Sequence, residues 1–223
     1  MFLRLISSVI IVFICFGSIQ AQNSMAFSIK AYETKADFHK NVNALPVGFS
    51  FSYLRSIEES RFSYGGEFGV AMYNNETINV TENGTTFQVD EEDCFLTFHA
   101  FLRYDMYENN WSKVYAEARM GATTFFSSRI AEDYESDFES DFDFHGTAFN
   151  TGFGGGLLVN PASVFNKEEG GDFWLDFGVS FNSGSKANYR MAPEGNGNYS
   201  IQDGKYRSLT HYVAYRVGFL VNF

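Results

Sequence analysis

The last thirteen residues, 211–223, alternate between large apolar side chains and smaller or polar ones. Successive side chains of a β-strand point to opposite faces, so this alternation predicts a strand with one apolar face and one face of small and polar groups. The apolar face carries Val213, Tyr215, Val217, Phe219, Val221 and Phe223.

The same period of two recurs along the chain and predicts an all-β fold with eight antiparallel strands. We place them near 25–34, 45–56, 60–74, 93–107, 111–126, 146–160, 172–183 and 206–223. No convincing apolar pattern with the period of an α-helix accompanies them. The connections alternate between tight turns (57–59, 108–110) and long polar stretches (75–92, 127–145, 184–205). This asymmetry is typical of a transmembrane up-and-down β-barrel.

Residues 1–21 have the three parts of a secretory signal peptide. Met1–Arg4 is short and basic, 5–16 is almost entirely apolar, and 17–21 supplies small residues before the cleavage site. The apolar run is too short to span a membrane as a helix. We therefore predict cleavage near Ala21 and a single barrel domain over 22–223.

The charge balance argues against nucleic acid as a partner. Without residues 1–21, 15 basic residues face 27 acidic ones, whereas binding to phosphates requires Lys and Arg. Cys94 is then the only cysteine, so an intramolecular disulfide and a thiolate metal cluster are excluded. We expect no cofactor and no bound metal at a dedicated protein site.

The size of the barrel predicts which face is inside. An eight-stranded barrel has an interior just wide enough for side chains, and the many large aromatic residues of the apolar set would overfill it. The opposite set is rich in glycine, serine and charge, so we place it in the lumen. Its predicted charge network comprises Lys30, Glu67, Arg103, Asp105, Lys113, Glu117, Arg119, Asp176 and Arg216. These residues either plug the lumen as ion pairs, the interpretation that the narrow lumen favours, or gate a narrow path for ions or small solutes.

Aromatic side chains are expected where the barrel crosses the two membrane interfaces. For the rim with the short turns we predict Tyr107, Trp111 and Phe223. For the rim with the long loops we predict Tyr73, Phe125, Phe126 and Phe181.

The connection around 132–144 is unusual because its acids alternate with aromatic residues. Three interpretations stay open: a divalent-cation site, a β-extension whose aromatic face meets an extracellular partner, and a solvated acidic loop. The acids of this outer loop are Glu132, Asp133, Glu135, Asp137, Glu139, Asp141 and Asp143.

The histidines raise the question of catalysis, because some small membrane barrels modify lipids. His145 and Thr147 stand two residues apart, which would place a histidine and a hydroxyl on one face. Those enzymes use serine with histidine, however, and the surrounding sequence is unlike theirs. We find no nucleophile elbow, phosphate-binding loop or zinc-ligand spacing, and we predict no catalytic residues.

The whole mature pattern resembles the small outer-membrane barrels of the OmpA and OmpX type, in the style of the porin-family barrels of the Bacteroidetes. The terminal strand, through Tyr215, Phe219 and Phe223, resembles their insertion signal. The resemblance implies a monomer in the outer membrane of a Gram-negative cell, with membrane lipid and the barrel-assembly machinery as partners. It implies a structural or surface role. The alternatives are a narrow porin-like channel, a lipid-modifying enzyme and a soluble lipocalin-like binder.

Overall fold

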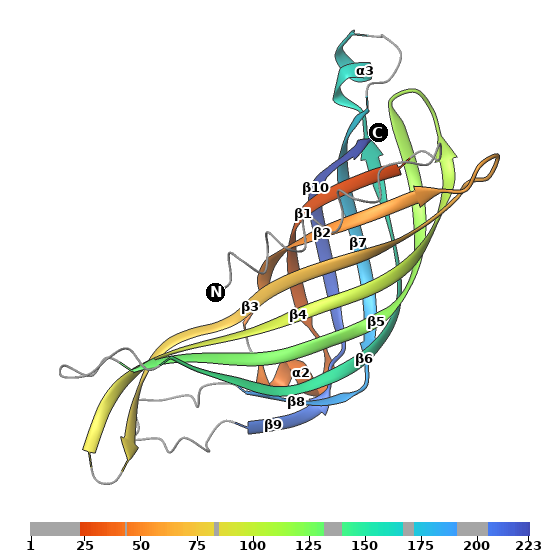
Figure 1. Cartoon of the computed structure of the whole chain (residues 1–223). Coiled ribbons are helices and arrows are strands. Elements are labelled where there is room, and N and C mark those ends of the chain that lie inside the picture. The colour runs from red at the N-terminus through yellow and green to blue at the C-terminus, as the bar shows by residue number, and fades with distance from the viewer. Residues whose placement is uncertain (1–22, 43, 83–84, 132–139, 167–171, 191–204) are drawn as a thin grey trace.

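The computed structural model is a closed antiparallel β-barrel in which the strands follow the order β1-β10-β7-β6-β5-β4-β3-β2 (Figure 1). It describes residues 23–42, 44–82, 85–131, 140–166, 172–190 and 205–223. The predicted signal peptide and most of the acidic outer loop lie outside these residues. The predicted all-β, eight-stranded barrel is thereby confirmed.

The eight barrel strands are of two lengths. Four have 10–12 residues: β1 (Asn23–Thr34), β2 (Val47–Ser56), β7 (Phe173–Gly184) and β10 (Tyr212–Asn222). Four have 20–24 residues: β3 (Phe62–Glu82), β4 (Thr85–Glu108), β5 (Ser112–Ala131) and β6 (Ser140–Val159).

The barrel closes where the first and last strands pair. β1 runs antiparallel to β10 from Ser24↔Asn222 to Thr34↔Tyr212, and Phe223 N donates a hydrogen bond of 2.9 Å to the Asn23 carbonyl oxygen. A closed sheet leaves no edge of unpaired backbone groups, which is the condition for crossing lipid with strands.

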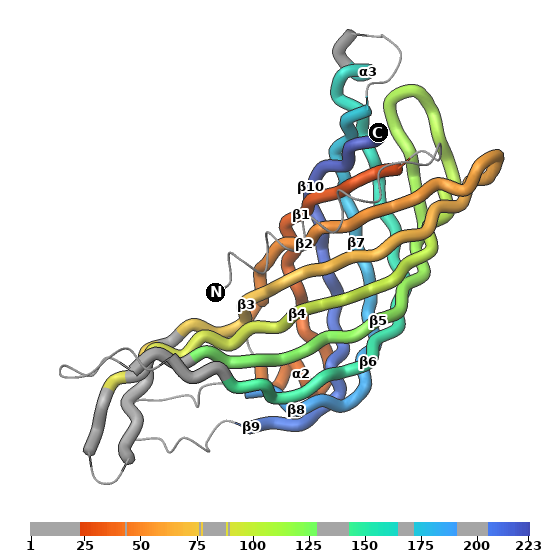
Figure 2. Tube along the Cα trace, in the orientation of Figure 1, coloured from red at the N-terminus to blue at the C-terminus, as the bar shows by residue number. Residues whose placement is uncertain are grey.

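The two ends of the barrel differ. At one end, which we name the turn end, short turns join β2 to β3 and β4 to β5. At the other, the loop end, β3–β6 continue well past the short strands and form a sheet that stands away from the barrel (Figures 1 and 2). The strand register is irregular near the start of this extension, between Met72 and Asn74 and between Phe125 and Phe126. Such bulges bend a strand.

The faces are arranged as the size argument predicts. Lumen side chains such as Lys30 and Glu67 are 2% and 4% exposed. The exterior carries large exposed apolar side chains from every strand, among them Phe27, Phe62, Tyr64, Phe98, Leu102, Phe149, Phe153, Phe177, Tyr215 and Phe219. An apolar exterior around a charged interior suits a barrel surrounded by lipid and not by water.

Strands β3–β6 are longer than predicted, because they extend through much of 75–92 and 127–145, the stretches expected to be connections. Three other elements also differ from the expectation. Two short helices, α2 (Ala36–Asn41) and α3 (Pro161–Asn166), occupy connections with no helical period. The predicted last strand, 206–223, is divided: its first part is β9 (Lys205–Leu209), which pairs with β8 (Lys186–Arg190) in a separate hairpin. Neither helix in the described part of the chain is long and apolar enough to cross a membrane.

Candidate functional site

Glu67 on β3 is the centre of the ion pairs inside the barrel. Its Oε1 lies 2.5 Å from Lys30 Nζ and 2.6 Å from Arg119 Nη2. His99 Nδ1 and Arg216 Nη1 approach the same carboxylate at 3.7 Å. Four bases from four different strands therefore share one buried acid.

Arg216 on β10 connects this group to a second one. Its Nη2 lies 3.4 Å from Glu117 Oε1, and its Nε lies 3.0 Å from Asp176 Oδ2. Arg103 donates two hydrogen bonds to Glu117 Oε1, from Nε at 3.0 Å and from Nη2 at 2.6 Å. Glu67, Glu117 and Asp176 are thus joined through a single guanidinium.

Tyr115 on β5 fills the lumen beside these charges. Its hydroxyl donates a hydrogen bond of 2.5 Å to Asp176 Oδ1, and the Arg103 guanidinium lies 4.0 Å from its ring centroid. The ring fits because Gly178 faces it: a Cβ at Gly178 would lie 2.9 Å from the Tyr115 hydroxyl and 3.0 Å from Arg216 Nε. The glycines of the lumen face thereby make room for the large polar side chains.

The structure brings seven of the nine predicted lumen residues into one network. Four are cations (Lys30, Arg103, Arg119, Arg216) and three are carboxylates (Glu67, Glu117, Asp176), so the network carries one excess positive charge. The other two lie closer to the turn end. Lys113 Nζ pairs with Glu108 at 2.6 Å, and Asp105 is only partly buried.

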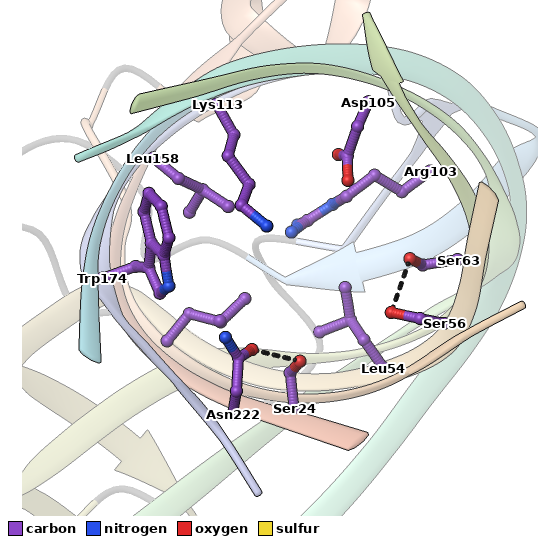
Figure 3. Close-up of a pocket in the computed structure, with 11 residues that line it drawn as sticks. Ser24, Leu54, Ser56, Ser63, Arg103, Asp105, Lys113, Leu158, Trp174 and Asn222 are labelled. Carbon is purple, nitrogen blue, oxygen red and sulfur yellow. Dashed lines mark hydrogen bonds between the residues drawn. The ribbon is translucent and has the colours of Figure 1, made fainter. Parts of the chain in front are cut away.

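A small cavity opens at the turn end. Its volume is about 40 Å³, and Figure 3 shows the charged ends of Lys113 and Arg103 pointing toward each other across it. Lys113 Nζ also lies 4.9 Å from the Trp174 ring centroid. Since a water molecule needs at least about 10–15 Å³, the cavity has room for a few waters at this mouth.

An aromatic cluster that the sequence did not reveal seals the loop end. Phe38 of α2 points inward and is 1% exposed. Its ring centroid lies 5.0 Å from that of Tyr189 on β8 and 5.7 Å from that of Phe125 on β5. We name this group the outer plug; its buried members are Tyr32, Phe38, Val42, Ala71, Tyr73, Phe95, Phe125, Ala148, Ala187, Tyr189, Tyr212 and Ala214.

Specific polar contacts fix the two elements that complete the plug. Asn41 Nδ2 of α2 donates a hydrogen bond of 2.6 Å to the Tyr189 hydroxyl. Arg190 Nε pairs with Glu91 at 2.6 Å, and its carbonyl oxygen accepts a bond of 2.7 Å from the Tyr73 hydroxyl. We name α2 together with the β8–β9 hairpin the cap. These contacts hold the cap over the loop end of the barrel lumen.

The predicted aromatic rim is correct at the turn end and largely wrong at the loop end. Tyr107, Trp111 and Phe223 are exposed by 50–57%. Phe181 is exposed as predicted. Three other side chains proposed for the outer rim are buried instead: Tyr73, Phe125 and Phe126, at 3%, 0% and 7% exposure.

For Tyr73 and Phe125 the physical reason is the alternation itself, whereas Phe126 comes directly after the register irregularity between Phe125 and Phe126. Tyr73 continues the inward positions of β3 after Glu67, and Phe125 continues those of β5 after Arg119. The lumen accepts these rings at the loop end because Phe38 and Tyr189 of the cap provide apolar partners. Strict counting along each strand could have found this signal.

His145 pairs with a hydroxyl other than the predicted one. Its Nε2 lies 2.7 Å from Ser127 Oγ, whereas Thr147 pairs with Thr124 at 3.0 Å. The Ser127 hydroxyl donates its hydrogen to Asp93, so Nε2 of His145 is the donor to Ser127. A catalytic base would accept that hydrogen, and Ser127 is 1% exposed. This pair therefore has the arrangement of a structural contact.

The remaining predicted residues lie apart from the lumen network. Residues 132–139 of the acidic loop lie outside the described residues. The backbone of Asp141 on β6 lies opposite that of Arg129 on β5, and Asp143 is half-buried. Tyr215, Phe219 and Phe223 are exposed on the outer surface. Their role as an insertion signal stays a prediction.

Among known proteins, the chain resembles solved structures but has no detectable similarity of sequence to a protein-family model or a curated protein. No protein-family model matches the chain, and no curated protein matches its sequence. The crystal structure of Neisserial surface protein A covers 90% of this chain and 97% of its own, with 12% identity and a TM-score of 0.53.

Two further structures align over similar lengths. Ail of Yersinia pestis, in complex with the heparin analogue sucrose octasulfate, covers 92% of this chain and 100% of its own, with 14% identity and a TM-score of 0.49. OprG of Pseudomonas aeruginosa covers 91% and 96%, with 13% identity and a TM-score of 0.46. At these identities the likeness concerns the fold alone. The chain therefore has the fold of the small outer-membrane β-barrels.

Proposed function

We propose that this chain is a non-enzymatic surface protein of an outer membrane, in which the barrel is a plugged support for the structures at its loop end. The observation that carries the proposal is the filled lumen. Lys30, Arg119 and Arg216 converge on Glu67, and the gap that these three cations line with Ser180 is too small for a water molecule. The outer plug closes the same path a second time.

The topology supports placing the loop end on the extracellular side. Asn23 and Phe223, the first and last residues that the structure describes, both lie at the turn end, and small membrane barrels have short turns on the periplasmic side. The cap and the extension of β3–β6 then face the outside of the cell. They are the surfaces through which such a protein would meet a partner.

Planar-bilayer recording tests the plugged barrel against the narrow porin-like channel. We expect no steady current from the folded protein, because ions would have to displace paired charges that already fill the lumen. Retention of the protein in vesicles after a carbonate wash confirms insertion and excludes the soluble lipocalin-like alternative. A steady current that changes in Arg119→Ala would refute the proposal in favour of the channel.

The lipid-modifying alternative has little support from the geometry. The hydroxyl that contacts His145 is buried and donates to Asp93. A lipid profile that is altered by expression of the protein, and restored by His145→Ala, would nevertheless establish an enzyme.

A further inference from the structure

The exposed side of the cap is positively charged, although the chain as a whole is strongly acidic. Within its described residues, Ala36–Asn41, Lys186–Arg190 and Lys205–Leu209, the cap exposes four cations, Lys40, Lys186, Lys205 and Arg207, and one acid, Asp37. The whole chain has 16 basic residues against 27 acidic ones. A local excess of cations on such a chain requires an explanation.

The strand pattern of the hairpin accounts for the display of these cations. Ala187, Tyr189 and Ser208 are buried against the barrel, so the alternate positions point away from it, except Arg190, which is buried and paired with Glu91. Lys186, Lys205 and Arg207 occupy those positions and are exposed. Since the buried face is fixed by the outer plug, the charged face is held in place before any ligand arrives, and less ordering entropy is lost on binding.

Helix α2 adds to the same surface. Lys40 Nζ lies 3.0 Å from Asp37 Oδ1, and this hydrogen bond lowers the pKa of the Asp37 carboxyl. Asp37 is therefore ionised at neutral pH and offsets one cation. Lys186 and His211 also lower the pKa of the Asp37 carboxyl. Helix α2 and the hairpin are therefore close enough to interact electrostatically.

The height of the cap places it at the border of the apolar exterior. β1 ends at Thr34 and β2 begins at Val47, next to the cap. Val47 pairs with Met72, and both are exposed on the outside of the barrel, at 51% and 40%. The apolar band therefore reaches the level of the cap, where a membrane presents its headgroups.

We propose that the cap binds the phosphate groups of outer-leaflet lipid headgroups through Lys40, Lys186, Lys205 and Arg207. The apolar exterior beside the cap favours lipid over a soluble polyanion. Val47 and Met72 are exposed at the level of the cap, so lipid headgroups are the phosphate groups nearest to its cations. This proposal rests on the proposed surface role, but bilayer conductance tests that role independently.

The test compares binding of bisphosphorylated lipid A to the folded full-length protein in maltoside micelles. The variant Lys186→Gln/Arg207→Gln removes two cations of the cap. The matched control, Arg55→Gln/Arg61→Gln, removes two at the turn end. With a contribution of about 1 kcal/mol per cation near a charged lipid surface, we expect about 30-fold weaker binding for the cap variant and less than about twofold for the control.

Four outcomes decide the proposal. Binding that weakens in the cap variant, and for dephosphorylated lipid A with the wild type, supports it. Equal binding of phosphorylated and dephosphorylated lipid overturns it, as does equal weakening in both variants. Heparin binding that exceeds lipid A binding and is lost in the cap variant would replace the lipid with a soluble polyanion. Heat-modifiable electrophoretic mobility of each variant shows that the barrel is folded.

Discussion

Replacement of Glu67 with glutamine is expected to lower the free energy of unfolding by about 3–5 kcal/mol, the usual effect of breaking a buried ion pair on one side. Glutamine keeps the shape of the side chain but removes its charge. Lys30 and Arg119 would lose the carboxylate that they contact at 2.5 and 2.6 Å. The excess charge of the network would rise from one to two. Urea titration of the barrel in lipid vesicles measures the change.

Two variants make this expectation specific to the buried network. Lys30→Met/Glu67→Gln restores an excess of one charge, and we expect it to recover much of the loss because no unpaired amine is left buried. Glu108→Gln breaks the ion pair between Glu108 and Lys113, in which the Glu108 side chain is 55% exposed. This change should lower the free energy of unfolding by no more than about 1 kcal/mol. If Glu67→Gln unfolds at the same urea concentration as Glu108→Gln, the network does not stabilise the barrel.

Much of the barrel could be predicted from the sequence because its physical cause is local and repeated. Alternation decides which side chains point inward, and lumen volume decides which face must be polar. These two rules were enough to place Glu67, Arg119 and Arg216 on one inner surface. Their pairing partners depend on the register between neighbouring strands, which alternation within one strand does not give.

The cap could not be predicted by the same rules. Phe38 lies in a helix of six residues, too short to show an apolar period. Tyr189 lies in a five-residue strand whose partner, β9, follows after a long connection. An isolated aromatic residue in a polar connection has no partner that the sequence specifies. Only the folded barrel brings Phe38, Tyr189 and Phe125 together.

Replacement of Phe38 with alanine is expected to release the cap while the barrel stays closed. A buried Phe→Ala change typically costs about 3–5 kcal/mol. The loss should fall on the cap because the Phe38 ring packs against Tyr189 and Phe125. If opening of the cap governs exchange, amide hydrogens in β8 and β9 should exchange at least about 100-fold faster. Hydrogen exchange with mass spectrometry measures this.

The control variant is Phe149→Ala, which removes the same atoms from a ring that is 58% exposed on the outside of the barrel. It should leave exchange in the cap unchanged. Pairing between β1 and β10 near the turn end, from Ser24↔Asn222 to Ser28↔Gly218, is the internal reference in both variants, because these residues are not members of the outer plug. Faster exchange in β1 as well as in the cap would mean that the two parts unfold together. Unchanged exchange in β8 and β9 would mean that Arg190 and Asn41 hold the cap without the ring.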